Sequence, residues 1–582
     1  MEDIYFSNER NTQMLIYMLK AYGINTIIAS PGATNGNVVA SFQCDPYFNI
    51  YSCVDERSAA YMAVGMAEET GRPIVLSCTG ATSSRNYMPA LTEAYYRKLP
   101  VIALTSSRDN IFRGHLVAQV TDRSDPPRDT VVESIYIQNI YSLDDEWDCN
   151  IRLNRALQLH ISKPGPVHIN MATGADDHCT TKEIPATKII KKYRIIDDLP
   201  EIDANAHIAV YIGSHKRFST KESSVIDDFC SKYNAVVFCD HTSSFYGIYR
   251  FQYSLLGAQD RAYYPDVNKI NLLIQIGEVS GDYDTLHHLS INKVWRVSPD
   301  GEFRDTFRRH LDAVFEMQEY DFFSHYAEKV KGKDSSYLDL CHSIYDKLYR
   351  RIPELPLSNI YVASKLSKVL PEDSIIYLGI LNSLRSWNFF ELPRGVRAVS
   401  NVGGFGIDGI LSSLVGASLT NLSKLYFGVI GDLSFFYDMN ALGNRHIGNN
   451  LRLVIINNGH GQEFLNYNHG AASLGDKVRL YVAAEGHFGY KSRQLVKHYV
   501  EDLGFEYMSA ATKEEFDYQY LRFVATNSKS VVLEVFTDEK DENDALRSMR
   551  NIDNNINQNI TANIKAAIKK VVPDVIIKKL RD

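Results

Sequence analysis

The chain has 582 residues, of which 45% are apolar and 23% charged, and its formal net charge is −8. This length allows three or four domains, and the negative charge provides no electrostatic basis for nucleic-acid binding. The sequence contains no apolar signal region, no run of about 18 apolar residues and, among its eight cysteines, no Cys-x-x-Cys pair. We therefore expect a soluble cytoplasmic protein with reduced thiols and without a transmembrane segment.

Residues 1–180 are predicted to form a first α/β unit, because short apolar runs alternate with helical stretches. Two polar motifs directly follow such runs: Ser30-Pro31-Gly32 and Cys78-Thr79-Gly80. Between them, Glu56 opens a helix; an acidic residue there is by itself an ordinary feature, since acids favour the helix dipole. The expected strands are Thr26–Ala29, Ile74–Ser77, Val101–Leu104 and Val167–Ile169.

The rest of the chain is predicted to hold two more such units. Residues 181–206 are rich in Thr, Lys, Pro and Asp and are predicted to be a linker. The second unit is expected at 207–345, with strands at Ile208–Ile212, Ala235–Phe238, Leu272–Ile276 and Lys293–Val297. The third is expected at 355–540, with strands at Ile375–Leu378, Leu425–Ile430, Leu453–Ile456 and Val531–Val535. The chain is thus predicted to be an α/β protein with three parallel-sheet domains of similar size.

The third unit carries a candidate metal site. Asp432 follows one expected strand, and Asn458 follows the next. Both would lie at the carboxyl ends of parallel strands, where open α/β sheets bind ligands. A carboxylate, an amide oxygen and a backbone carbonyl just beyond would suit a Mg²⁺ ion that holds a diphosphate. The alternative is an ordinary βαβ unit with Asp and Asn in its turns.

Residues 541–582 are predicted to form a C-terminal helical tail. Isoleucines recur every four residues from Ile556 to Ile568, with Lys565, Lys569 and Lys570 beside them. A basic amphipathic helix can lie on a membrane surface or dock a partner. A single apolar stripe favours instead a helix that packs on its own subunit or on a dimer mate.

The motifs Gly431-Asp432 and Asn457-Asn458 together resemble the signature of thiamine diphosphate-dependent enzymes, and residues 26–90 resemble the pyrimidine-binding domain of that family. The resemblance implies that the three units are pyrimidine, central and diphosphate domains, each a doubly wound parallel sheet. It implies thiamine diphosphate and Mg²⁺ as cofactors. It also implies that the pyrimidine domain of one subunit faces the diphosphate domain of another, so that the protein is a homodimer or homotetramer.

The resemblance assigns roles to individual residues. Glu56 matches the glutamate that hydrogen-bonds the aminopyrimidine ring and favours the imino tautomer that removes the thiazolium proton. Gln119 matches a glutamine at the reactive centre, and Asp432, Asn458 and the backbone carbonyl of His460 match the metal ligands. The implied cofactor-binding residues are Pro31, Gly32, Glu56, Thr79, Gly80, Asn86, Ser383, Gly406, Ile407, Gly431, Asp432, Leu433, Ser434, Asn458, His460 and Gly461.

Leu433 and Ser434 place the chain near one branch of the family, which contains 2-succinyl-5-enolpyruvyl-6-hydroxy-3-cyclohexene-1-carboxylate synthase, a menaquinone-pathway carboligase. The arginines that anchor the substrates of that branch are missing: Thr34, Trp387 and Val402 stand in their places. Asp282 stands near the place of a missing Lys-Arg pair as well. Since bidentate arginine is the natural partner of a carboxylate, we expect a different acceptor, with Thr34 and Val402 at the substrate site.

Three more side chains are candidates for the substrate site. Glu463 stands where that branch has an apolar residue, and it could relay protons or bind a hydroxyl or amino group. The alternative is a helix-start glutamate stabilised only by the helix dipole. Arg85 and Arg385 are candidates for binding the donor carboxylate, and the alternative for both is an ordinary surface arginine.

These residues favour an enzyme that decarboxylates a 2-oxo acid and transfers the product to a carbonyl acceptor, with sugar-derived aldehydes or ketones as one acceptor class. The alternative is a simple 2-oxo acid decarboxylase that releases an aldehyde, with Glu463 as the proton donor. The two reactions share their early steps, so the sequence does not separate them. A non-catalytic thiamine-binding scaffold is disfavoured, because Glu56, Asp432 and Asn458 are all present.

Overall fold

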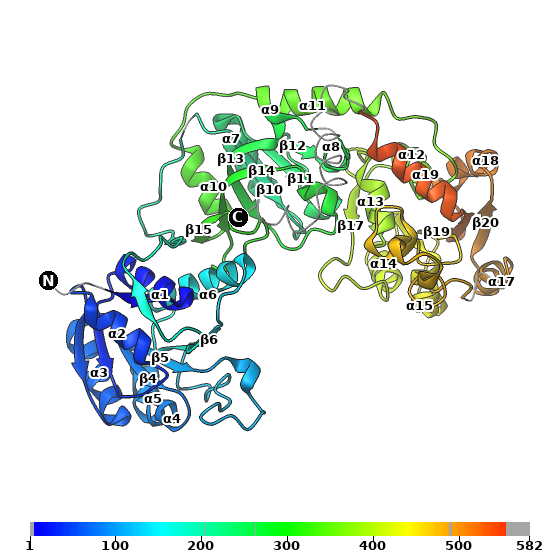
Figure 1. Cartoon of the computed structure of the whole chain (residues 1–582). Coiled ribbons are helices and arrows are strands. Elements are labelled where there is room, and N and C mark those ends of the chain that lie inside the picture. The colour runs from blue at the N-terminus through cyan, green and yellow to red at the C-terminus, as the bar shows by residue number, and fades with distance from the viewer. Residues whose placement is uncertain (1–4, 204, 262, 488–491, 554–582) are drawn as a thin grey trace, which may run out of the picture. The chain divides into compact units, whose positions relative to one another are not determined.

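The computed structural model describes residues 5–203, 205–261, 263–487 and 492–553. The chain divides into two compact units (Figure 1). Of the described residues, those up to Leu199 and Pro299–Met317 form the N-terminal unit, and those of Pro200–Ser298 and from Gln318 to Asp553 form the C-terminal unit. The isoleucine-rich helix predicted around 556–568 lies outside the described residues. In the four described ranges, no helix has both the length and the apolar character needed to cross a bilayer.

A six-stranded parallel sheet forms the centre of the N-terminal unit, in the order β3-β2-β4-β5-β7-β6. Its strands are β2 (Thr26–Ala29), β3 (Asn49–Ser52), β4 (Ile74–Thr79), β5 (Val101–Ser107), β6 (Glu133–Ile137) and β7 (Val167–Ala172). The helices are α1 (Arg10–Ala21), α2 (Gly36–Cys44), α3 (Glu56–Thr70), α4 (Thr82–Asn86), α5 (Met88–Arg97) and α6 (Leu143–Ser162). β1 (Phe6–Ser7) pairs antiparallel with β8 (Cys179–Thr181), and β9 (Lys191–Arg194) pairs in parallel with β15 (Leu311–Glu316).

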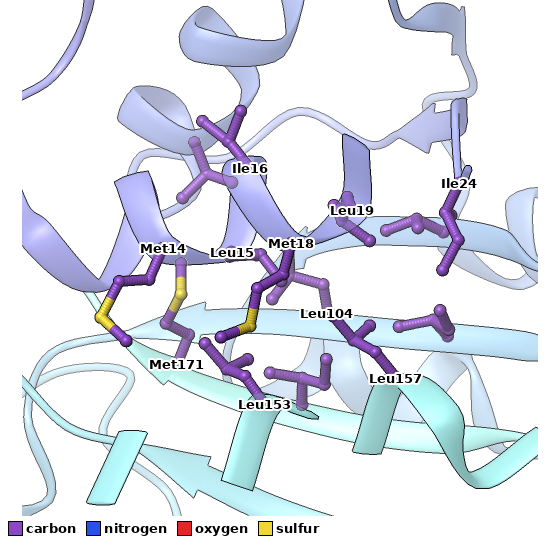
Figure 2. Packing of buried hydrophobic residues seen from close by; sticks show 14 of the residues in the cluster. Met14, Leu15, Ile16, Met18, Leu19, Ile24, Leu104, Leu153, Leu157 and Met171 are labelled. Carbon is purple, nitrogen blue, oxygen red and sulfur yellow. The ribbon is translucent and has the colours of Figure 1, made fainter. Parts of the chain in front are cut away.

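Helices cover both faces of this sheet. In β4, the side chain of Val75 belongs to the core on one face and that of Leu76 to the core on the other. This alternation explains why the strand is a continuous apolar run, as expected for parallel strands that are buried on both sides. Figure 2 shows the first core, in which Met14 and Met18 of α1 lie near Leu153 of α6. The second core contains the alanines of α3, Ala59, Ala60, Ala63 and Ala67.

The C-terminal unit contains two further parallel sheets. The first has the strand order β12-β11-β10-β13-β14. Its strands are β10 (Ile208–Ile212), β11 (Val236–Cys239), β12 (Arg250–Gln252), β13 (Lys269–Ile276) and β14 (Ser290–Val297). The accompanying helices are α7 (Thr220–Tyr233), α8 (Ser254–Gly257), α9 (Pro265–Asn268), α10 (Glu319–Ala327) and α11 (Ser336–Tyr349).

The second sheet of this unit is six-stranded and parallel, in the order β17-β16-β18-β19-β21-β20. Its strands are β16 (Ile375–Leu378), β17 (Arg397–Val399), β18 (Tyr426–Gly431), β19 (Leu451–Asn457), β20 (Glu506–Ala510) and β21 (Val531–Phe536). Its helices are α12 (Asn359–Leu366), α13 (Asn382–Asn388), α14 (Ile410–Ser418), α15 (Asp432–Asp438), α16 (Gln462–Leu465), α17 (Leu495–Asp502), α18 (Lys513–Val524) and α19 (Glu539–Arg550). The predicted α/β class with doubly wound parallel sheets is therefore confirmed.

Candidate active site

A cleft opens at the carboxyl ends of β16, β18 and β19 in the C-terminal unit. Its position follows from the topology, because neighbouring parallel strands deliver their following loops to the same edge of the sheet. Most of the site residues predicted for this part of the chain line it. They are Ser383, Ile407, Gly431, Asp432, Leu433, Ser434, Asn458, His460, Gly461 and Glu463.

Asp432 is the buried carboxylate of this cleft, with only 4% of its surface exposed. Its two oxygens accept hydrogen bonds from the backbone N–H of Leu433 at 2.8 Å and of Gly459 at 2.7 Å. Burial raises the pKa of Asp432 to about 7, although these hydrogen bonds act in the opposite direction. A bound cation would strongly stabilise the ionised form of such a fixed, poorly solvated carboxyl group, since a nearby positive charge favours ionisation.

The oxygens beside Asp432 are suited to a hard metal ion. The loop after β19 turns at Gly459, whose φ of +79° favours glycine, and this turn returns the chain past Asp432. Asn458 and His460 both line the cleft with Asp432. One carboxylate, one amide oxygen and one backbone carbonyl make a typical protein contribution to Mg²⁺, which takes its other ligands from phosphate and water. These residues therefore fit the implied diphosphate-bound metal.

The loop before α14 also contributes to the cleft. The Ser434 hydroxyl donates to the backbone carbonyl of Ile407 at 2.7 Å and so ties this loop to the start of α15. Ile407 lines the cleft, whereas Gly406 is absent from its lining. A Cβ atom on Gly406 would lie 2.3 Å from Oδ1 of Asp408, so a larger residue there would require the Asp408 side chain to move.

Arg385 and Glu463, predicted separately as substrate-site residues, form an ion pair with each other. Both nitrogens of the guanidinium fork donate to the carboxylate, at 2.9 and 3.0 Å. Burial opposes the charge of Arg385, but the Glu463 carboxylate offsets this effect and the pKa of Arg385 rises above its ordinary value. Asn382 and Asn466 extend the network, because Asn466 donates to Oδ1 of Asn382 at 2.8 Å and to Glu463 at 3.3 Å.

Two other residues of the predicted substrate pocket lie outside the cleft lining. Val402 is buried and packs beside Gly281, where a Cβ atom would lie 2.4 Å from a Val402 methyl group. Asp282 is 2% exposed, and its carboxylate accepts hydrogen bonds from Asn388 at 2.8 Å and from the backbone N–H of Asp284 at 3.0 Å. Burial raises the pKa of Asp282 well above its ordinary value. Asp282 therefore contributes to the interior rather than to the surface of the pocket.

The cleft also contains a residue that the sequence motifs do not predict. Asn359, at the start of α12, lines the cleft and donates from its side chain to the Ser383 hydroxyl at 3.1 Å. Its backbone N–H donates to the buried carboxylate of Glu542 in α19, at 3.0 and 3.2 Å. Glu542 thus supports one wall of the cleft from a position far away in the sequence. The only sequence signal is the Ser358 helix cap, which resembles many others.

The pKa of Glu542 gives a testable pH effect. Burial raises this pKa from 4.5 to about 7, so the folded protein keeps a proton that the unfolded chain releases between these values. The contribution of Glu542 to the free energy of unfolding should therefore be largest below about pH 4.5 and fall by up to about 3 kcal/mol as the pH rises through about 7. Urea unfolding of the wild type and of Glu542→Gln at about pH 5 and about pH 8 measures this pH-dependent contribution. Relative to the wild type, the variant should be more stable at the higher pH than at the lower pH. If the difference in the free energy of unfolding between the two proteins is the same at both pH values, the raised pKa of Glu542 is contradicted.

In the N-terminal unit, the predicted pyrimidine-side residues gather at the carboxyl ends of β2 and β4. The Thr34 hydroxyl contacts the Thr79 hydroxyl and donates to the backbone carbonyl of Ser106 at 2.6 Å. A Cβ atom on Gly32 would lie 2.8 Å from Cβ of Thr79, so the Pro31-Gly32 turn needs glycine to approach this strand end. Thr34 therefore joins β2, β4 and β5 through its hydroxyl group.

Glu56 is the first residue of α3, which Asp55 caps by accepting a hydrogen bond from the backbone N–H of Ser58. Its carboxylate is partly exposed and accepts a long hydrogen bond of 3.4 Å from the side chain of Asn86 in α4. The unit therefore brings together two residues that the resemblance assigns to cofactor binding. Tyr87, which follows Asn86, is completely buried.

Arg85 and Gln119 are exposed in this unit, and Gln119 has a φ of +65°. Arg85 donates to the backbone carbonyl of Asp122 at 2.7 Å. The sequence motifs do not single out Arg123, which is 5% exposed and donates to Ser107 and to Asn170. One of its nitrogens would lie 2.1 Å from a Cβ atom on Gly80. Gly80 thus leaves room for the buried guanidinium of Arg123.

Comparison with known proteins agrees with the motifs. Residues 10–125 match the family described as thiamine pyrophosphate enzyme, N-terminal TPP binding domain. Over most of its length the chain is also similar to proteins named 2-succinyl-5-enolpyruvyl-6-hydroxy-3-cyclohexene-1-carboxylate synthase. The protein of Bacteroides fragilis is 29% identical over 92% of this chain and 97% of its own length. That of Phocaeicola vulgatus is 29% identical over 93% and 98%, and that of Flavobacterium johnsoniae is 26% identical over 78% and 84%.

Proposed function

Because this chain is a thiamine diphosphate-dependent enzyme, we propose that it decarboxylates a 2-oxo acid and joins the remaining acyl fragment to a carbonyl acceptor. The observation that carries this proposal is the cleft at the carboxyl ends of β16, β18 and β19, which Asp432, Asn458 and His460 line together. When bound, thiamine diphosphate supplies the carbon that adds to the donor carbonyl and takes up the electron pair left by CO₂. The protein supplies binding, orientation and protons.

The side chains would divide this work as follows. Asp432, the Asn458 amide and the backbone carbonyl of His460 would hold Mg²⁺ against the diphosphate. Ile407 would support the cofactor, and Gln119 would contact the reactive centre. Glu56 would share a proton with a ring nitrogen of the aminopyrimidine, an interaction that a carboxyl can make and an amide cannot.

We propose a hydroxylated, sugar-derived acceptor rather than a polycarboxylate. At the positions of the missing arginines, Trp387 and Val402 are buried and Thr34 is hydrogen-bonded to neighbouring strands. None of these side chains offers the charged fork that recognises carboxylates. Glu463 adds a carboxylate to the cleft wall, which suits hydroxyl or amino donors.

A homodimer or homotetramer is part of this proposal. The outer side of α3, beside Glu56, exposes Tyr61 by 48% and Met62 by 38%, and the nearby Val54 is 77% exposed. Covering such side chains would favour association of two copies. Light scattering on the purified protein measures its molar mass in solution. The mass of a monomer at working concentration would contradict the proposed homodimer or homotetramer.

A substrate panel tests the proposed reaction. The holoenzyme is incubated with 2-oxo acids, each with and without sugar-derived and simple aldehydes, and CO₂ release and product masses are measured together. We expect CO₂ and a product whose mass is that of the donor acid plus the acceptor minus CO₂. CO₂ with a free aldehyde in every mixture would indicate the alternative, a simple decarboxylase. No CO₂ from any 2-oxo acid would contradict both reactions.

A further inference from the structure

In the Arg385–Glu463 pair, the Glu463 carboxylate occupies the position at which an arginine usually binds a substrate carboxylate. Both donors of the guanidinium fork are bound to the two oxygens of Glu463, at 2.9 and 3.0 Å. One of these nitrogens also donates to Oδ1 of Asn382 at 3.2 Å. Bidentate Arg–carboxylate pairing is geometrically demanding, so a second carboxylate cannot bind in the same way while Glu463 is in place.

The two partners differ in how they relate to the cleft. Glu463 lines it, with Asn382 on one side, whereas Arg385 is not part of the lining. The side chains of both are only 15% and 14% exposed. A ligand in the cleft therefore meets the carboxylate of the pair, and the cation lies behind it. Asp282 and Asp284, on the loop after β13, also act on the charge of Arg385 from the side of the first sheet of this unit.

Buried pairs of this kind are hard to open. A ligand carboxylate that displaced Glu463 from Arg385 would leave a poorly solvated Glu463 with Asn466 as its hydrogen-bond donor. Breaking a buried pair by removing one partner is strongly unfavourable, because the other charge remains without compensation. The pair should therefore stay closed when a dianionic ligand arrives, and the ligand should be repelled.

We propose that the Arg385–Glu463 pair is a specificity element that rejects 2-oxo acids with a second carboxylate and admits donors whose only carboxylate is the one lost as CO₂. This inference rests on the proposed function, since it concerns the donor of that reaction. Specificity of this type comes from a repulsive group placed against the wrong ligand as well as from contacts to the right one. Donors whose side chain carries hydroxyl groups in place of a second carboxylate have a hydrogen-bond acceptor in Glu463.

Glu463→Gln tests the pair in the holoenzyme. The amide removes the negative charge and frees part of the Arg385 fork, so the cleft should become attractive to a second carboxylate. The ratio of kcat/KM for CO₂ release from pyruvate to that from 2-oxoglutarate is measured. We expect this ratio to fall by about 10–100-fold in the variant, mainly through KM for 2-oxoglutarate. An unchanged ratio in a folded, cofactor-binding variant would overturn the inference.

Two further variants separate this effect from general damage. Glu391→Gln breaks another ion pair of the same unit, with Arg250 at 2.6 Å, and should leave the donor ratio unchanged. Adding Arg385→Gln to Glu463→Gln should abolish the gain for 2-oxoglutarate, because the gain depends on the freed guanidinium. A double variant that keeps the gain would show that Arg385 does not bind the second carboxylate.

A binding measurement keeps the inference testable even if the proposed reaction fails. Calorimetric titration of the holoenzyme with glutarate and with pentanoate compares a dicarboxylate with a monocarboxylate of the same length. Glu463→Gln should gain affinity for glutarate about tenfold or more, and pentanoate should change little. Equal changes for both ligands would overturn the specificity role. Absence of CO₂ from every 2-oxo acid would instead count against the proposed function alone.

Discussion

Replacing Asp432 with alanine is expected to lower the affinity for thiamine diphosphate at fixed Mg²⁺ by at least about 100-fold, since even indirect metal contacts contribute 10–100-fold. Asp432 would be the one charged protein ligand among the three proposed for the metal, and it is buried at the carboxyl end of β18. Isothermal titration with the cofactor measures the loss. Unchanged affinity would place the diphosphate site elsewhere in the protein.

The fold should survive this substitution. Asp432 has a pKa raised to about 7 by burial, so its ionised form costs stability in the cofactor-free protein near neutral pH. Asp432→Ala removes that cost. The variant should therefore lose cofactor affinity without a matching decrease in the melting temperature of the cofactor-free protein. Asp476→Ala, at an exposed position on the same unit, is the matched control and should bind the cofactor normally.

The same pKa predicts the pH dependence of cofactor binding. A metal ion competes with the proton on Asp432, so binding of Mg²⁺ and the cofactor should tighten as the pH rises towards about 7 and level off above it. The slope below this value should approach about tenfold per pH unit. Titrations of the wild type across this range show the slope, and Asp432→Ala should lack it.

Replacing Glu56 with glutamine is expected to leave thiamine diphosphate bound and to slow proton exchange at its thiazolium carbon by about 10²–10⁴-fold, the usual contribution of a general acid or base. The amide keeps the shape of the side chain but cannot share a proton with the pyrimidine ring. NMR after acid quench in deuterated buffer follows the exchange without any substrate. Glu69→Gln, on the same helix, is the control, and exchange at the wild-type rate in Glu56→Gln would reject this role.

Much of the fold could be predicted because the central strands are buried on both faces and appear in the sequence as continuous apolar runs. The expected strands Thr26–Ala29, Ile208–Ile212 and Ile375–Leu378 match β2, β10 and β16 to the residue. Short edge strands were not predicted. β3 is largely exposed and β17 has only three residues, so neither has an apolar run to mark it.

The sequence predicts those cleft residues that a short motif marks, but not the pairs formed between distant segments. Asp432 and Asn458 follow adjacent strands, and the topology alone brings their loops to one edge. The pairing of Arg385 with Glu463, 78 residues apart, and of Asn359 with Glu542, 183 residues apart, depends on how helices pack on the sheet. No spacing rule in the sequence specifies such pairs, and burial of Asp282 depends likewise on Asn388 of α13.

A labelled donor tests the central claim, that the enzyme forms a carbon–carbon bond. The holoenzyme receives the donor identified in the substrate panel, labelled with ¹³C at its carbonyl carbon, together with an aldehyde labelled at its own carbonyl carbon. Carbon NMR then detects coupling between the two labels. The proposed reaction predicts a one-bond ¹³C–¹³C coupling in a product that forms at the rate of CO₂ release. Labelled aldehyde released from the donor, with no coupled product for any acceptor, would contradict it.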